Sequence, residues 1–168
     1  TSEPALPRVI HGFAFQPYQK DQDAIAGEDP TTTQIDADLK LMAGTTRAVR
    51  TYSSIGSLGE IPALARKHGL KVMLGSWIDS DRDRNDREVE AAIRLANTNR
   101  NVTRIRIGNE VVLRGDRPVE DLIAHLDRVR AATKQPVSTA EPWHVWIKHP
   151  ELVAHVDFIT VHMLPYWE

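Results

Sequence analysis

Apolar residues along this chain follow two spacings that alternate from one end to the other. Short runs rich in β-branched and aromatic residues predict six strands, at residues 8–15, 47–52, 71–77, 102–107, 135–139 and 157–163. Between these runs apolar positions recur every three or four residues, which predicts helices at 33–42, 57–67, 88–96, 118–132 and, briefly, 151–154. This succession of strands and helices is typical of an α/β protein with a parallel sheet.

Local signals support several of the predicted helix ends. A threonine is available as the N-cap of the helix at 33–42, and Gly44 is placed to end it. Ser57 and Glu60 have the spacing of a capping box for the second helix, and Gly69 follows its end. Pro118 fits the first turn of the helix that runs to residue 132.

Polar and aromatic residues recur where the predicted strands end, and this distinguishes two kinds of parallel sheet. An open doubly wound sheet usually binds its ligand at one reversal of strand order, often with a Gly-rich phosphate loop. The chain contains neither a G-x-G-x-x-G nor a Walker A pattern. In a closed barrel, by contrast, all strand ends converge on one pocket. A (β/α)8 TIM-type barrel is therefore favoured, since such residues stand at or just after the C-terminal end of nearly every predicted strand: Tyr18, Tyr52, Trp77, Glu110, Glu141 and His162.

The length of the chain limits how much of a barrel it can form. A complete eight-stranded barrel typically takes about 250 residues. The chain has 168 residues, enough for about six of the eight strand–helix units. We therefore expect residues 1–168 to form the N-terminal portion, about three quarters, of a single barrel domain. The remaining units would come from further polypeptide, either fused to this segment or completing it.

Composition narrows the classes of partner. The formal net charge is −2 and basic residues are dispersed among acidic ones, which argues against nucleic acid as a partner. The chain has no cysteine, so disulfides, thiolate nucleophiles and zinc–thiolate sites are excluded. No apolar run reaches the roughly 18 residues that a membrane span needs. Nothing in the sequence implies a metal ion or an organic cofactor.

One acid-rich loop has the spacing of a calcium-binding loop but not its other requirements. Residues 79–85 read Asp-Ser-Asp-Arg-Asp-Arg-Asn, and Glu90 follows them. A calcium loop needs glycine at its sixth position, where Arg84 stands, and two arginines would oppose a cation. We expect instead a solvated loop whose acids cap the N-terminus of the next helix.

The fourth predicted strand ends in the most informative motif of the chain, Gly108-Asn109-Glu110. A barrel strand delivers such residues to the carboxyl edge of the sheet, which is where barrel enzymes carry out their chemistry. A glycosidase needs a carboxylic acid to protonate the leaving oxygen, and an amide can hold a sugar hydroxyl. The motif therefore suggests a site that cleaves sugars, and such a site requires a second carboxyl group.

Six motifs at the strand ends together resemble glycoside hydrolase family 17, in particular its bacterial β-1,3-glucanases and β-1,3-glucanosyltransferases. The resemblance extends from the first predicted strand to the last, and it implies a retaining mechanism on a (β/α)8 barrel. The residues that carry it are 12–18 (Gly-Phe-Ala-Phe-Gln-Pro-Tyr), 50–53 (Arg-Thr-Tyr-Ser), 75–78 (Gly-Ser-Trp-Ile), 107–110 (Ile-Gly-Asn-Glu), 140–146 (Ala-Glu-Pro-Trp-His-Val-Trp) and 162–168 (His-Met-Leu-Pro-Tyr-Trp-Glu).

The resemblance implies roles for individual residues. Glu110 matches the general acid/base, and Asn109 matches the amide that binds the sugar 2-hydroxyl. Arg50 and Tyr52 match a pair that lines the floor of the pocket. The family's nucleophile is a Glu at the end of the seventh strand, and no residue of this chain matches it. A retaining glycosidase needs two carboxyl groups about 5–5.5 Å apart. We therefore expect the nucleophile beyond residue 168, and no activity from this segment alone.

Further residues are expected to contact substrate because they stand at the same edge of the predicted barrel. Trp77 and His162 stand near strand ends, and Glu141 and Glu168 come after strands. Aromatic rings in the adjoining loops can stack on sugar faces. Two alternatives stay open: the loop aromatics are buried anchors instead, or His162 makes a structural hydrogen bond. Neither Glu141 nor Glu168 is expected to be the nucleophile, since neither ends a seventh strand. The loop aromatics are Trp143, Trp146, Tyr166 and Trp167.

The expected reaction is hydrolysis of β-1,3-glucan or transfer of a glucan chain to another sugar, with a glucan oligosaccharide or polysaccharide as the partner. One alternative is a non-catalytic glucan-binding or scaffold barrel. Another is a clan relative that acts on a different β-glucoside linkage. The resemblance favours a periplasmic or other extracytoplasmic location in a bacterium.

Overall fold

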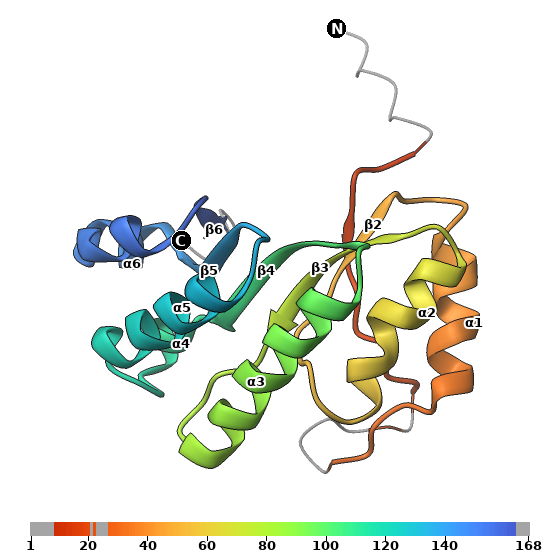
Figure 1. Cartoon of the computed structure of the whole chain (residues 1–168), viewed down its shortest axis with the longest axis horizontal. Coiled ribbons are helices and arrows are strands. Elements are labelled where there is room, and N and C mark those ends of the chain that lie inside the picture. The colour runs from red at the N-terminus through yellow and green to blue at the C-terminus, as the bar shows by residue number, and fades with distance from the viewer. Residues whose placement is uncertain (1–8, 21, 23–26, 164–168) are drawn as a thin grey trace, which may run out of the picture.

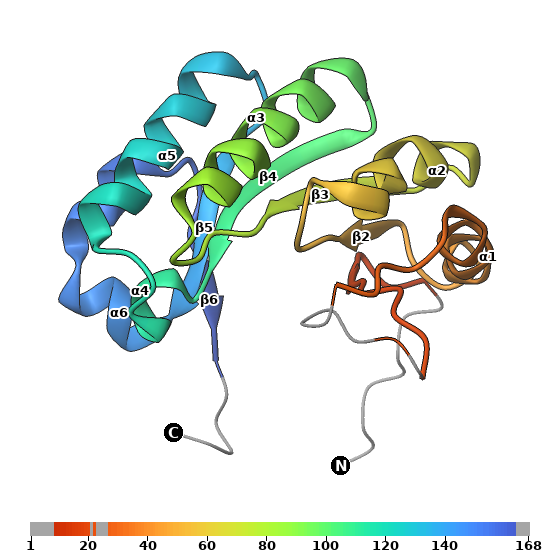
Figure 2. The same ribbon diagram turned by 90° about the horizontal axis from the view of Figure 1, so that it is seen from below.

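Six parallel strands form one curved sheet in the computed structural model of the protein, which describes residues 9–20, 22 and 27–163 (Figure 1). Each strand pairs in parallel with the next one along the chain, and the sheet curls into a half-barrel (Figure 2). This confirms the predicted α/β fold of the TIM-barrel type. The strands are β1 (Phe13–Ala14), β2 (Ala48–Arg50), β3 (Lys71–Ser76), β4 (Val102–Asn109), β5 (Val137–Pro142) and β6 (Thr160–His162).

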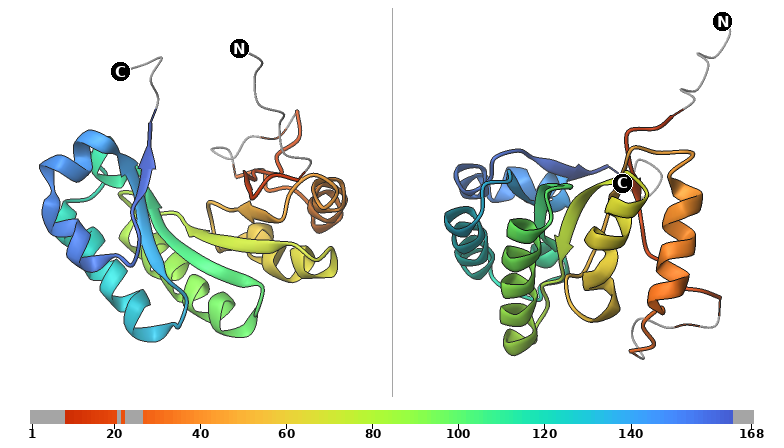
Figure 3. Two further views of the ribbon diagram at one scale, coloured as in Figure 1. Left: turned by 90° about the horizontal axis from the view of Figure 1, so that it is seen from above. Right: turned by 45° about the vertical axis from the view of Figure 1, so that its right-hand side comes forward.

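The longer helices cover the convex face of this sheet (Figure 2, Figure 3). They are α1 (Thr32–Met42), α2 (Ile61–Lys67), α3 (Arg82–Thr98) and α5 (Val119–Ala132). Shorter elements follow the ends of β2, β4 and β5, namely the 3₁₀ turns η1 (Gly56–Glu60) and η2 (Pro150–His155) and the helices α4 (Val111–Arg114) and α6 (Trp143–Lys148). Within the described ranges, none of the helices combines the length and the apolar character that crossing a membrane requires.

The side chains of β4 show why the sheet has two different faces. Successive residues of a strand point to opposite faces, and Ile105 and Ile107 are fully buried in the apolar core. Burying each of these side chains contributes about 1.5–3 kcal/mol. Arg104 and Arg106 alternate with them and so belong to the concave face, where Arg106 is buried and Arg104 is exposed.

The end of β2 approaches β3 so closely that only glycine fits at position 75. A Cβ atom on Gly75 would overlap the carbonyl group of Thr51. The Gly75 amide donates to Thr51 Oγ1 at 2.8 Å, and the Ser54 hydroxyl donates to the Gly75 carbonyl at 2.8 Å. These contacts fix the segment after β2, which carries Tyr52.

The acid-rich loop before α3 caps that helix, as predicted. Asp81 Oδ1 accepts a hydrogen bond from the Arg84 amide at 3.0 Å, and Asp79 Oδ1 accepts one from the Asp81 amide at 2.8 Å. The helix therefore begins at Arg82, well before the predicted start at residue 88, because the cap and not the apolar spacing sets its first turn. Among the described residues, no group of three or more His, Cys, Asp or Glu side chains is placed to hold a metal ion.

Two further predictions about helices are wrong. The capping box of Ser57 and Glu60 does not form, because these residues lie within the 3₁₀ turn η1, whose N-cap Ile55 makes no side-chain cap bond. Helix α2 begins only after this turn. The aromatic segment that starts at Trp143 is the short helix α6 and not a loop. A helix of six residues is too short for apolar periodicity to show it.

Candidate active site

Glu110 lies at the carboxyl end of β4 in a backbone conformation that residues other than glycine rarely adopt. Its φ is 57° and its ψ is 34°, in the left-handed region. Gly108 has a φ of 78°, and the register between β4 and β5 shifts between Arg106 and Asn109. This bulge turns the strand end so that the Glu110 amide donates to the Ala140 carbonyl at 2.8 Å. Strained backbone of this kind concentrates at functional sites, which makes Glu110 the leading candidate.

A histidine from another strand holds the side chain of Glu110. Nδ1 of His162, in β6, lies 2.6 Å from Glu110 Oε1. The His162 side chain is 17% exposed and that of Glu110 is 25% exposed. The carboxyl group is therefore oriented but still accessible, as a group that exchanges protons with a substrate must be. His162 therefore makes a hydrogen bond with Glu110, while a contact between His162 and substrate stays a prediction.

A second cluster lies on the concave side of the sheet between β2 and β4. Arg50 Nη2 donates to the Tyr52 hydroxyl at 2.5 Å, and the guanidinium of Arg106 lies 4.6 Å from the centre of the Tyr52 ring. Arg106 also donates to the side-chain oxygen of Asn109 and, at 2.9 Å, to the carbonyl of Thr51. The structure therefore brings together Arg50, Tyr52 and Asn109, all three of which the sequence suggested as site residues.

Arg106 connects this cluster, although the sequence did not suggest it as a site residue. The pKa of Arg106 is lowered to about 9, first by burial and then by the positive charge of Arg50, while the negative charge of Glu110 opposes this shift. One signal in the sequence points to its position. Arg106 stands between Ile105 and Ile107 in a strand, so it must face the side of the sheet opposite to these two apolar residues.

A cleft of about 830 Å³ lies at the carboxyl edge of β1, β2 and β3 and extends to the start of α3. Its volume lies within the range of about 300–1,000 Å³ that is usual for small-ligand sites. The predicted substrate-binding residues Tyr52 and Trp77 form part of its wall. Tyr18, Asp79 and Arg84 also line it, so the wall combines aromatic rings with charged groups.

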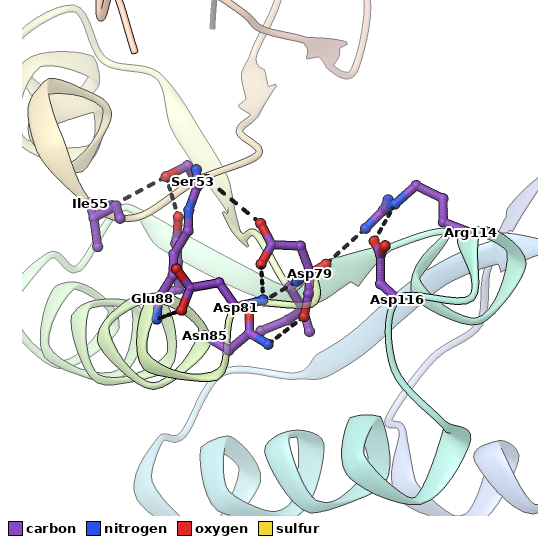
Figure 4. Close-up of polar contacts among 10 residues, drawn as sticks. Ser53, Ile55, Asp79, Asp81, Asn85, Glu88, Arg114 and Asp116 are labelled. Carbon is purple, nitrogen blue, oxygen red and sulfur yellow. Dashed lines mark hydrogen bonds and ion pairs between the residues drawn. The ribbon is translucent and has the colours of Figure 1, made fainter. Parts of the chain in front are cut away.

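The ring of Trp77 is held in place from α4. The guanidinium of Arg114 lies 4.5 Å from the centre of the Trp77 ring, a cation–π contact. Arg114 also donates to the Ile78 carbonyl at 2.8 Å and pairs with Asp116 at 2.7 Å (Figure 4). Glu110 is the N-cap residue of α4, and Arg114 is the last residue of that helix. The contacts of Arg114 therefore connect the wall of the cleft with the predicted acid.

A buried carboxylate connects α3 to the chain behind the cleft. Glu88 is fully buried, and its carboxylate accepts hydrogen bonds from the Ser53 hydroxyl and, at 2.7 Å, from the Ser54 amide. Figure 4 shows Ser53 and Glu88 facing each other across this contact. Burial raises the pKa of Glu88 above its ordinary range, whereas hydrogen bonds from Ser53, Ser54 and the Trp77 backbone lower it. Glu88 thus ties α3 to the segments that carry Tyr52 and Trp77.

The sequence did not suggest Glu88 either, although a signal for it exists. Glu88, Ala92 and Ala96 follow one another at four-residue spacing, and all three are buried on α3. A carboxylate on the apolar stripe of a helix must find hydrogen-bond partners, because an unpaired buried charge is costly. Its partners, however, come from the segment after β2 and were not visible in the sequence.

Glu141, which the sequence suggested as a substrate contact, is fully buried at the end of β5. Its carboxylate accepts hydrogen bonds from the amides of Val112 at 3.0 Å and Leu113 at 3.4 Å, in the first turn of α4. Burial raises the pKa of Glu141, these two hydrogen bonds lower it, and the charge of Glu110 raises it. Glu141 therefore supports the helix that follows Glu110, and a contact with substrate stays a prediction.

The predicted aromatic contacts have different environments. Trp143 is 44% exposed and packs edge-on against His144 with ring centres 5.7 Å apart. Trp146 is buried and donates from its indole nitrogen to the Thr160 carbonyl at 3.2 Å, which makes it an anchor of α6. The remaining predicted contacts lie outside the described residues: Tyr166, Trp167 and Glu168.

Comparisons with known proteins agree on one family. Residues 12–168 match the family model of the BtgE/BtgC glycoside hydrolase domain. The chain is 23% identical over 182 residues to the probable glucan endo-1,3-beta-glucosidase btgC of Aspergillus flavus, covering 99% of this chain and 26% of that protein. It is 30% identical over 146 residues to the glucan 1,3-beta-glucosidase of Schizosaccharomyces pombe, covering 79% of this chain and 45% of that protein. The chain thus spans less than half the length of these relatives.

Solved structures show the same architecture. The glycoside hydrolase family 17 β-1,3-glucanosyltransferase of Rhizomucor miehei matches with a TM-score of 0.76 and 26% identity, covering 94% of this chain and 58% of that chain. An active-site mutant of that enzyme in complex with laminaritriose matches over the same shares with a TM-score of 0.77. A family 2 glycosyl hydrolase from Bacteroides cellulosilyticus shares the fold at a TM-score of 0.60 and 15% identity, covering 79% of this chain and 19% of that chain.

Proposed function

Because the chain belongs to the BtgE/BtgC glycoside hydrolase family, we propose that it supplies the acid/base side of a retaining site for β-1,3-glucan. The observation that carries this proposal is the position of Glu110. This residue directly follows β4 at the carboxyl edge of the sheet, its backbone is in the left-handed region, and its side chain contacts His162. Two similar curated proteins are named as β-1,3-glucosidases, and a similar solved enzyme is in complex with laminaritriose.

Glu110 acts twice in this proposal. It first donates a proton to the glycosidic oxygen as the bond to the leaving sugar breaks and a covalent glycosyl-enzyme forms. It then takes a proton from water, which gives hydrolysis, or from a hydroxyl of another sugar, which gives chain transfer. The hydrogen bond with His162 keeps the carboxyl group in one orientation through both steps.

The neighbouring residues bind the sugar in this proposal. Asn109 donates from its amide to the 2-hydroxyl of the sugar whose bond is cut, a contact that strengthens in the transition state. Arg50 and Tyr52, which are hydrogen-bonded to each other, form the floor of the sugar-binding site. Trp77 offers an aromatic ring on the wall of the cleft, against which a sugar can stack. Substrate contacts by His162, Glu141, Trp143, Tyr166, Trp167 and Glu168 remain part of the proposal.

The nucleophile in this proposal is a carboxylate from polypeptide other than residues 1–168. The negative charge of Glu110 raises the pKa of Glu141, but backbone amides in the first turn of α4 donate to both oxygens of the Glu141 carboxylate. Apolar side chains are exposed on both edge strands, with Phe13 at 38% on β1 and Val161 at 39% on β6. Such edges suit further strands, which could place a second carboxylate about 5–5.5 Å from Glu110.

The test is to incubate the complete protein with laminari-oligosaccharides of one length and to separate the products. Shorter products indicate hydrolysis and longer ones chain transfer, and both outcomes support the proposal. Binding of the oligosaccharide without any product would indicate a glucan-binding scaffold and would overturn it. Activity only on β-1,4- or β-1,6-linked glucans would retain the mechanism but overturn the assigned substrate.

A further inference from the structure

Arg106 is a buried cation to which the proposed mechanism gives no task. Its side chain is completely inaccessible to solvent on the concave face of β4. Removing a charge from water is costly unless hydrogen bonds and favourable charges compensate for it. An apolar residue at this position would avoid that cost, so the contacts of the guanidinium indicate what its presence achieves.

Three groups hold the guanidinium of Arg106. Nη1 donates to the side-chain oxygen of Asn109, and Nη2 donates to the Thr51 carbonyl at 2.9 Å. The Tyr52 ring faces the guanidinium carbon, with its centre 4.6 Å away. Tyr52 in turn accepts a hydrogen bond from Arg50. Arg106 therefore joins the segment after β2 to the bulge that ends β4, and its guanidinium is held by two hydrogen bonds and by the Tyr52 ring.

The chemistry of the two side chains decides how the Asn109 amide is oriented. A guanidinium carries only hydrogen-bond donors, so the part of the amide that faces Arg106 must be the carbonyl oxygen. The NH2 group is then on the side of the amide away from Arg106. An asparagine without such a partner can turn its amide over and present the oxygen instead.

We infer that Arg106 is a positioning residue, which holds the amide of Asn109 so that its NH2 group is directed to the 2-hydroxyl of the sugar. Arg106 does not touch substrate itself and acts through Asn109, with the Tyr52 ring as its second support. This inference rests on the proposed function, because it adds a residue to the same site. It predicts that a loss of Arg106 matters only when the substrate carries the hydroxyl that Asn109 binds.

The test compares two substrates in the complete protein. One is a laminari-oligosaccharide, and the other is the same compound with 2-deoxyglucose as the unit whose glycosidic bond is cut. With the first, Arg106→Met is expected to lower kcat about tenfold or more with little change in KM, because an oriented hydrogen bond to the transition state is lost. With the 2-deoxy substrate, the same variant is expected to stay within about twofold of the unmodified protein, since the coupled partner is absent.

Arg104→Met is the matched control, since Arg104 lies two residues earlier on the same face of β4 but is exposed. It is expected to retain the unmodified rates on both substrates. Thermal unfolding checks that Arg106→Met is folded; if it is not, Arg106→Lys replaces it, which keeps the charge but not the planar pair of donors.

Equal losses on both substrates would indicate a merely structural role and would overturn the inference, as would no loss on either. The failure of the proposed function looks different: the unmodified protein would then release no product from the laminari-oligosaccharide, and the inference would fall with it.

Discussion

Nδ1 of His162 lies 2.6 Å from Oε1 of Glu110, although 52 residues separate the two in sequence. The two residues belong to the ends of β4 and β6, which are separated in the sheet by β5. The sheet is curved through β4, β5 and β6 (Figure 2), so the ends of β4 and β6 approach each other, and there the two side chains meet. The contact therefore depends on the barrel-like curl itself, and it links the fold directly to the orientation of the predicted acid.

Removing this contact should weaken catalysis without abolishing it. His162→Ala in the complete protein is expected to lower kcat/KM for laminari-oligosaccharides by about tenfold, because hydrogen bonds to charged groups are worth about 1.5–3 kcal/mol. His162→Asn is expected to restore much of this loss, since its amide nitrogen can take the position of Nδ1. Equal activity of the alanine variant and the unmodified protein would show that His162 does not orient Glu110.

Removing the transferable proton should have a larger effect. Glu110→Gln retains the shape of the side chain but cannot donate or accept the proton, so kcat is expected to fall by about 100-fold or more. The measurement is product formation from laminari-oligosaccharides, with unfolding temperature as a check that the fold is intact. Glu120→Gln, at an exposed position of α5, is the control and should leave the rate unchanged. Unchanged rates in Glu110→Gln would remove the central assignment.

The sequence was sufficient to predict approximately where the strands end and that Arg50, Tyr52 and Asn109 lie close together there. Parallel strands deliver their carboxyl ends to one edge, so residues such as Asn109 and Tyr52 could be placed near one another without knowledge of any contact. Because successive side chains of a strand point to opposite faces, the sequence of β4 also shows which of its side chains share a face. These properties depend on local spacing, and the structure retains them.

The groups that support the site could not be predicted in the same way. Arg106 and Glu88 have the spacing of interior residues, but their partners come from the segment after β2, which only the folded sheet brings alongside. The role of Glu141 likewise depends on α4, a helix of four residues that leaves no periodic pattern. Contacts between distant segments therefore account for what sequence reasoning missed.

Because β2 and β3 approach each other so closely at Gly75, one added methyl group there is expected to destabilise the protein strongly. Gly75→Ala is expected to lower the free energy of unfolding by at least about 3 kcal/mol, because the new Cβ atom would overlap backbone atoms that cannot move without breaking the sheet. Urea unfolding of the complete protein measures this. Gly44→Ala is the matched control: its Cβ would meet only the Leu41 carbonyl, at 3.8 Å. Similar stability of the two variants would contradict the close approach.

The buried carboxylate of Glu88 predicts how stability depends on pH. Burial raises its pKa above the ordinary value of 4.5, so the folded protein retains the proton at pH values at which the unfolded chain has lost it. The stability that this provides is fully present below pH 4.5 and is lost as the pH rises through the raised pKa. Glu88→Gln cannot titrate, so its free energy of unfolding should fall less over this range.

Urea unfolding at a series of pH values from about 4 to about 7 checks this, with Glu90→Gln as the control. Glu90 lies on the same helix but is exposed and pairs with Arg128 at 3.1 Å, so its variant should retain the pH dependence of the unmodified protein. Burial also raises the pKa of Glu141, which leaves a smaller slope of the same sign in Glu88→Gln. If the curves of Glu88→Gln and Glu90→Gln run parallel, Glu88 is not the buried group that titrates.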